Sequence, residues 1–223
     1  MNIKLMLRAL FTFVAGALLL GAMIFLPAGT LAFPGGWVFM GVLFVPMLLL
    51  GAVLLLRAPD LLEKRLNRHE KEKTQKGVIG ISALMFIAVF VLSGLDFRFG
   101  WSRMPLGVCI GAAIVQLISY GLYAEVMREN AYLSRTIEVQ EGQKVVDTGM
   151  YAIVRHPMYA VTVVLFLAMP LTLGSWAAFA VMLIYPALIA VRILNEEKVL
   201  REGLAGYTDY CKKVRWRILP YVW

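Results

Sequence analysis

Residues 147–159 hold the first group of side chains that could carry chemistry. The segment includes Arg155 and His156, directly before Pro157. Proline suits the first turn of a helix, because the backbone N–H that it lacks would be unpaired there. The spacing therefore predicts Arg155 and His156 at a helix N-terminus, whose free N–H groups and partial positive charge favour a carboxylate or a phosphate. The alternative is that both side chains only anchor the helix at lipid headgroups.

A second group of polar residues follows a long apolar run, at residues 192–198. Arg192 and Glu196 are four residues apart and so share one face of a predicted helix, and so do Glu197 and Arg201. One interpretation is a solvated helix with ion pairs along it. The other is a binding site, in which the guanidinium holds an anion and the carboxylate holds a cation or ribose hydroxyls.

The usual motifs of soluble nucleotide-binding enzymes and hydrolases are absent. The chain has no G-x-G-x-x-G, no Walker A sequence, no G-x-S-x-G and no H-E-x-x-H. Cys109 and Cys211 lie far apart, so neither a disulfide framework nor a zinc site is expected. These absences count against a dinucleotide-binding domain.

Composition indicates a membrane protein. Of 223 residues, 61% are hydrophobic and 16% are charged, and the net charge is +8. Soluble domains have about 45–50% apolar and about 25% charged residues. The basic residues lie between long apolar runs, which favours cytoplasmic loops facing anionic membrane lipids over nucleic acid as the partner. The basic and aromatic tail, residues 207–223, is given the same interpretation.

Four apolar runs are long enough to cross a bilayer, at about 5–26, 37–56, 77–95 and 105–124. The first could instead be a secretory signal. A longer run at 157–191 is interrupted by Pro170, Gly174 and Ser175, which predicts a helical hairpin; a single kinked helix is the alternative. Gln116, Ser119, Tyr120 and Tyr123 share a face of the fourth run, either for function or for helix–helix contact.

The predicted fold is therefore all-α: a polytopic membrane bundle of about five to six helices, with a C-terminal hairpin and a cytoplasmic amphipathic tail helix. The positive-inside rule places both termini and the loop 57–76 in the cytoplasm, because this loop carries seven bases and four acids. That loop, with His69, is expected to be a solvated helical connector. The division expected is a four-helix membrane region, 1–124, and a cofactor-binding region, 125–223.

The ordered motifs resemble those of the integral-membrane isoprenylcysteine carboxyl methyltransferases, a superfamily that includes phospholipid methyltransferases. They are G-x-Y-x-x-x-R-H-P-x-Y (149–159), R-x-x-x-E-E (192–197), G-Y-x-x-Y (206–210) and R-x-R-x-L-P (215–220). The resemblance covers 88 residues, 136–223. The chain departs from it at Met150, where many members have proline, and at Val161, where glycine is frequent.

The resemblance implies a site for S-adenosyl-L-methionine built from the loop and the hairpin. Carried over by position, the residues lining it would be Gln143, Lys144, Val145, Val146, Tyr151, His156, Pro157, Met158, Tyr159 and Glu196. Arg192 would hold the carboxylate of the acceptor, and Arg192 and Glu196 are the expected catalytic residues. No metal is expected.

The implied activity is carboxyl O-methylation of a lipophilic, isoprenylcysteine-like acceptor that enters from the bilayer. A carboxylate nucleophile is already anionic and needs positioning and removal of water, not a strong base. A phospholipid amine is the alternative acceptor, and Glu196 or His156 would then have to take its proton. A non-catalytic scaffold, a small transporter and a lipid reductase using NADPH are the remaining alternatives.

Overall fold

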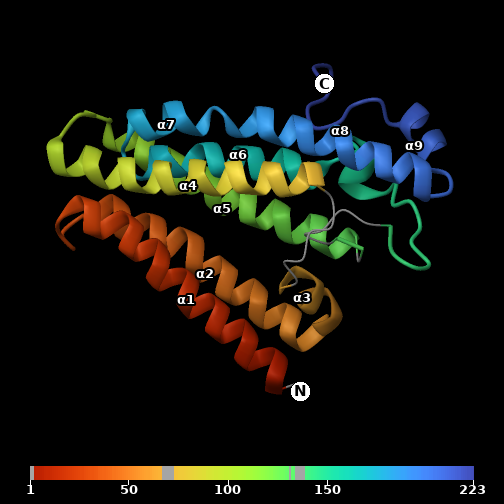
Figure 1. Ribbon diagram of the computed structural model, residues 1–223, viewed down its shortest axis with the longest axis horizontal. Coiled ribbons are helices and arrows are strands. Elements are labelled where there is room, and N and C mark those ends of the chain that lie inside the picture. Colours follow the sequence, from red (N-terminus) through yellow and green to blue (C-terminus); the bar gives the residue numbers. More distant parts are fainter. Residues whose placement is uncertain (1–2, 67–72, 131, 134–138) are drawn as a thin grey trace.

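The computed structural model describes residues 3–66, 73–130, 132–133 and 139–223, and the described part is helical with connecting loops (Figure 1). The predicted residue His69 lies outside it. The helices are α1 (Ile3–Ala28), α2 (Pro34–Arg57), α3 (Pro59–Leu66), α4 (Lys73–Phe99), α5 (Leu106–Glu129), α6 (Pro157–Thr172), α7 (Trp176–Met182), α8 (Tyr185–Gly203) and α9 (Tyr207–Lys213), with a short 3-10 helix at Gly149–Ala152.

Five segments of the described chain are long and apolar enough to cross a membrane. They are Ile3–Ala28, Pro34–Arg57, Gly77–Phe99, Leu106–Glu129 and Trp176–Gly203, and the shorter apolar α6 lies beside the last of them. The predicted polytopic helical bundle is confirmed. The tail helix α9 is short and amphipathic, with Tyr207 and Tyr210 buried and Lys212 exposed.

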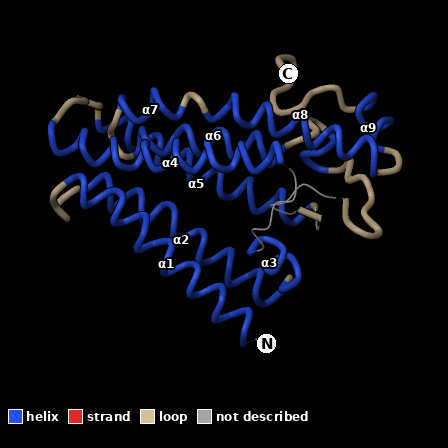
Figure 2. Tube along the Cα trace, in the orientation of Figure 1, coloured by secondary structure: helices blue, strands red, loops and turns tan. Residues whose placement is uncertain are grey.

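The long apolar run at 157–191 forms a hairpin, as predicted, and not one kinked helix. Helix α6 ends two residues after Pro170, and Gly174 turns the chain with a φ of +79°. Ser175 then caps α7 by accepting a hydrogen bond from the N–H of Ala178 at 3.0 Å. Figure 2 shows α7 and α8 returning alongside α6. The polar motif at the start of α6 and the polar motif in α8 therefore lie at the same end of the bundle.

A buried carboxylate holds the turn of this hairpin at the other end of the bundle. Asp96, which is 2% exposed, accepts hydrogen bonds from the hydroxyls of Ser102 at 2.6 Å and Ser175 at 2.5 Å. The N–H of Trp176 in turn donates to the Ser102 hydroxyl at 2.9 Å. The network ties the start of α7, and with it the turn of the hairpin, to the end of α4.

The buried core is formed by α1 and α2 together with α4, α6, α7 and α8, and α1 and α2 pack against the other helices from one side (Figure 1). Ile24, Phe39, Val89, Met182 and Ile193 are among its fully buried side chains. Helices α1 and α4 touch backbone to backbone at Gly94, where a Cβ would lie 2.4 Å from the carbonyl oxygen of Ile24. Small residues at such crossings are typical of membrane helix packing.

The polar residues of α5 divide between two roles. Gln116 is fully buried, and its amide donates to the carbonyl of Ala168 on α6 at 3.3 Å and to the hydroxyl of Thr172. Gln116 therefore joins α5 to α6. Of the two roles considered for the polar residues of this run, it has the role in helix–helix contact. Tyr123, two turns further along, lines the cavity described next.

Candidate active site

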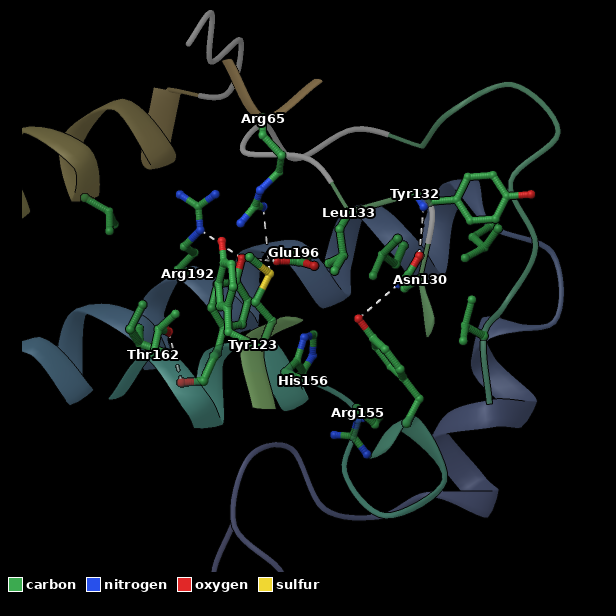
Figure 3. Close-up of a pocket in the computed structure, with 18 of the residues that line it drawn as sticks. Arg65, Tyr123, Asn130, Tyr132, Leu133, Arg155, His156, Thr162, Arg192 and Glu196 are labelled. Carbon is green, nitrogen blue, oxygen red and sulfur yellow. Dashed lines mark hydrogen bonds between the residues drawn. The ribbon is translucent and has the colours of Figure 1, made fainter. Parts of the chain in front are cut away.

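A cavity of about 680 Å³ opens at the end of the bundle where the hairpin begins and ends (Figure 3). Its volume is in the range of small-molecule sites. Ten of the eleven site residues predicted from the resemblance line it: Gln143, Lys144, Val145, Val146, Tyr151, His156, Met158, Tyr159, Arg192 and Glu196. The motifs that are far apart in the sequence thus meet around one space.

Pro157 is the predicted site residue that does not line this cavity. It is buried at the first position of α6 and faces a separate apolar groove between α5 and α6, beside Val161. His156 is the residue that precedes the helix, as the position of the proline predicts. Pro157 therefore sets the start of α6, and the neighbouring side chains reach the cavity.

Backbone geometry and two hydrogen bonds fix Tyr151 in the cavity wall. Gly149 has a φ of +53°, and a Cβ there would lie 3.0 Å from the carboxylate carbon of Glu129. The hydroxyl of Tyr151 accepts from Asn130 at 3.0 Å, and its carbonyl accepts from the hydroxyl of Tyr210 at 2.7 Å. Burial raises the pKa of Tyr151 to about 12, so its hydroxyl keeps its proton at neutral pH.

Arg192 and Glu196 meet at one side chain of α6. The hydroxyl of Tyr159 accepts from Nε of Arg192 at 2.9 Å and donates to Oε2 of Glu196 at 2.5 Å. The guanidinium also lies over the Tyr159 ring, 5.9 Å from its centroid. A cation, a hydroxyl and a carboxylate from the two arms of the hairpin thus form one polar row in the cavity wall.

Glu197, the next residue, is the centre of a buried ionic cluster that the sequence did not reveal. It is 3% exposed, and Oε1 accepts from Arg155 at 2.8 Å and lies 3.3 Å from Nε2 of His156. Arg217 donates to both of its carboxylate oxygens at 3.2 Å, and Arg201 lies 3.6 Å away. The predicted pairing of Glu197 with Arg201 is present, but Glu197 is buried instead of solvated, because α6 and the tail cover it.

Arg155 belongs to this cluster, so the interpretation that it only anchors the helix at lipid headgroups needs correction. Its guanidinium donates to Glu197 and to the carbonyls of Val214 and Arg215, both at 2.9 Å. It is 7% exposed, so it does not anchor α6 at lipid headgroups. Nε and Nη1 of Arg155 are directed at protein acceptors, so the side chain joins the start of α6 to the tail, and it also lines the cavity.

The tail crosses the start of α6 as an extended segment. The N–H groups of Arg155 and His156 donate to the carbonyls of Trp216 and Arg217, each at 2.8 Å. Arg217 also lies over the ring of Trp223, 4.9 Å from its centroid. The basic and aromatic residues of the tail therefore include a structural set that packs against the start of α6.

The cavity changes character along its length. On α8 the lining side chains follow one stripe, and Arg192 and Glu196 lie in the middle of it: Tyr185, Ile189, Arg192, Glu196, Leu200 and Leu204. Towards the turn of the hairpin the walls are apolar, with Phe86 of α4 and Phe166 of α6. Towards the loops the walls are polar, with Asn130, Gln143 and Lys144.

Arg65 of α3 was expected in a solvated connector, but it reaches the cavity. One guanidinium nitrogen lies 3.9 Å from Sδ of Met158, and the group stacks over Tyr123 at 5.3 Å from the ring centroid. In Figure 3 it approaches Glu196 from the side opposite His156. The cavity is thus lined from both expected regions, 1–124 and 125–223.

Part of the chain matches a known protein family. Residues 106–205, which include α5 and the whole hairpin, match the family model "Phospholipid methyltransferase". This segment is therefore similar to that family. The resemblance to membrane methyltransferases inferred from the motifs is confirmed, and it extends further towards the N-terminus than the motifs do, to include α5.

Two of the related proteins that match the chain have informative names or coverage. Delta(14)-sterol reductase TM7SF2 of Mus musculus is 31% identical over 91 residues, which are 40% of this chain and 22% of the reductase. The uncharacterized protein YpbQ of Bacillus subtilis (strain 168) is 27% identical over 161 residues, which are 70% of this chain and 96% of YpbQ. The chain is therefore also similar, over 91 residues, to a protein whose name gives a different reaction.

Proposed function

We propose that this protein is an integral-membrane methyltransferase that transfers a methyl group from S-adenosyl-L-methionine to the carboxylate of a lipophilic acceptor. The observation that carries the proposal is the single cavity with a polar end, an apolar end and the row Arg192–Tyr159–Glu196 between them. A polar methyl donor and an apolar acceptor need such a space, because their reacting atoms must meet where water is excluded. The family match supports the reaction class.

The residues present fit the methyl donor. S-adenosyl-L-methionine carries a carboxylate, an ammonium, ribose hydroxyls and an adenine ring. The polar end offers an amide and an ammonium from Gln143 and Lys144, the carboxylate of Glu196, and apolar walls from Val145 and Val146. When bound, the donor supplies a methyl group on a positively charged sulfur. Glu196 and His156 are the residues that we assign to holding it.

Arg192 is assigned to the acceptor. Its guanidinium can pair with a carboxylate and align one carboxylate oxygen with the methyl carbon, while Tyr159 and Glu196 keep the guanidinium in place. In the transfer, a bond forms between that oxygen and the methyl carbon as the carbon–sulfur bond breaks. The electron pair of that bond goes to sulfur, which becomes neutral. The step releases no proton, so no base is required.

The apolar end of the cavity is assigned to the lipid part of the acceptor. Its walls come from the apolar helices α4, α6 and α8, and the segments that contain α4 and α8 are long and apolar enough to cross a membrane. The region 125–223 would then supply the methyl donor site, and α4 in the region 1–124 would complete the acceptor site. We place this end of the bundle, with both termini, on the cytoplasmic side, where the methyl donor is available.

A transfer assay with two acceptors tests the proposal. Purified protein in detergent or liposomes receives methyl-labelled S-adenosyl-L-methionine with either an S-prenylated cysteine or phosphatidylethanolamine. Carboxyl methylation gives label that mild alkali releases as methanol, because the product is an ester. Alkali-stable label on the phospholipid would instead establish N-methylation, and no label on either acceptor would contradict both reactions.

N-methylation is the second candidate, and the name of the matching family favours it. An amine must lose a proton to become a nucleophile, and Glu196, in the same row as Arg192, would be the base. The sterol reductase match favours a third candidate, a reductase, which would require a hydride donor in place of the sulfonium. Binding of a reduced nicotinamide nucleotide in preference to S-adenosyl compounds would establish it.

A further inference from the structure

Three buried side-chain atoms have no hydrogen-bond partner within the described part of the chain: Oε1 of Gln116, Nδ2 of Asn195 and the hydroxyl of Tyr207. Buried polar atoms are almost always paired, so each needs a reason. Gln116 and Asn195 do not line the cavity, but Tyr207 does. Tyr207 is only 4% exposed, so its hydroxyl has little access to bulk solvent.

The surrounding residues hold Tyr207 in this position. Gly206 begins α9 with a φ of +82°, a conformation that glycine adopts without strain. The Tyr207 ring packs with Leu204 and Val145, and it lies 5.8 Å from the ring of Tyr210. Tyr210 is the informative neighbour, because its own hydroxyl is satisfied by the carbonyl of Tyr151 at 2.7 Å. One tyrosine of the G-Y-x-x-Y motif therefore closes the fold, and the other leaves its hydroxyl unpaired at the cavity.

The chemistry of this hydroxyl limits what it can bind. Burial raises the pKa of Tyr207 well above its usual range, so the side chain stays neutral and keeps its O–H donor. A buried unpaired hydroxyl destabilises the protein, and a ligand acceptor atom would remove that penalty. The residues around Tyr207 are those of the loop end of the cavity, such as Val145, and not those of the apolar end.

We propose that Tyr207 is a binding residue for the methyl donor, and that its hydroxyl donates a hydrogen bond to an acceptor atom in the part common to S-adenosyl-L-methionine and S-adenosyl-L-homocysteine. The proposal rests on the proposed function, since it concerns the same cavity. It adds a residue from the tail helix to the donor site. It also gives the first tyrosine of G-Y-x-x-Y a role that the second does not have.

The test compares Tyr207→Phe with Tyr210→Phe, which removes the same atom three residues away. Each variant is titrated with S-adenosyl-L-homocysteine by calorimetry, and its thermal unfolding is followed without ligand. Tyr207→Phe should weaken binding about three- to tenfold, as expected for the loss of one hydrogen bond, while its midpoint without ligand stays unchanged or rises. Tyr210→Phe should lower the midpoint, because the Tyr151 carbonyl loses its donor.

Titration with 5′-methylthioadenosine, which lacks the amino-acid carboxylate, locates the bond. Weaker binding of both compounds by Tyr207→Phe assigns it to the nucleoside, and weaker binding of S-adenosyl-L-homocysteine alone assigns it to the carboxylate. Unchanged affinity in folded Tyr207→Phe, or a lower midpoint without ligand, overturns the proposal. A wild-type protein that does not bind S-adenosyl-L-homocysteine overturns the proposed function itself, so the two failures are distinguishable.

Discussion

The hydroxyl of Tyr159 donates to Glu196 at 2.5 Å, and this bond joins the two arms of the hairpin inside the cavity. The same hydroxyl accepts from Arg192, so the guanidinium is oriented through tyrosine. Tyr159 ends the first sequence motif, and Arg192 and Glu196 belong to the second. The geometry explains why the motifs occur together: neither arm alone holds the guanidinium in place.

Arg192→Ala should abolish most turnover while leaving binding of S-adenosyl-L-homocysteine within about twofold of wild type. The reason is that we assign the guanidinium to the acceptor and not to the methyl donor. Loss of a charge-assisted contact of about 1.5–3 kcal/mol predicts a fall in kcat/KM of roughly ten- to 150-fold. Lys198→Ala, an exposed change on the same helix, is the matched control. Lost donor affinity with intact acceptor binding would show that the roles are reversed.

His156→Ala should weaken binding of S-adenosyl-L-homocysteine about tenfold, because His156 lines the polar half of the cavity. His156 also lies 3.3 Å from Glu197, so some stability is lost as well. Titration below the unfolding midpoint separates the two effects. Unchanged affinity in the folded variant would leave His156 with a structural role alone.

Glu197→Gln should destabilise the fold by about 3 kcal/mol, because it removes the anion that Arg155 and Arg217 share in a buried site. Unfolding in a denaturing detergent measures the change. Glu202→Gln, at an exposed position on the same helix, is the control and should have little effect. If the two variants unfold alike, the buried ionic cluster does not hold the tail in place.

Gly149→Ala should cost about 1–2 kcal/mol, since the residue has a positive φ and the new methyl group would meet Glu129. Gly111→Ala, in an open position of α5, should instead stabilise its helix by about 0.5–1 kcal/mol. Opposite signs in the two unfolding midpoints are the expected result. An unaffected Gly149→Ala would show that the turn before Tyr151 tolerates another conformation.

The sequence predicted what depends on local patterns. Apolar runs of sufficient length predicted the spans, and proline and glycine predicted the hairpin, because both effects act within a few residues. The i,i+4 spacing placed Arg192 and Glu196 on one face, and the structure confirms that both line the cavity. The resemblance carried by the motifs likewise predicted ten residues that line this cavity.

The features that the sequence did not predict depend on packing between segments that are far apart in the chain. Glu196 and Glu197 are adjacent glutamates, yet one lines the cavity and the other is buried against the tail, and helix periodicity alone assigned the latter to solvent. Arg65 looked like one base among seven in a charged loop, and its position over Tyr123 follows from how α3 packs. A buried carboxylate needs hydrogen-bond donors or cations around it, and the arginines in the tail were the available signal for Glu197.

The most direct test of the account is calorimetric titration of the purified protein with S-adenosyl-L-homocysteine, with NADPH as the competing ligand class. Glu196→Gln, which keeps the size of the side chain, is measured beside the wild type. The account predicts micromolar binding of S-adenosyl-L-homocysteine, at least tenfold weaker in Glu196→Gln, and no binding of NADPH. Binding of NADPH alone, or no binding of S-adenosyl-L-homocysteine by folded protein, would contradict it.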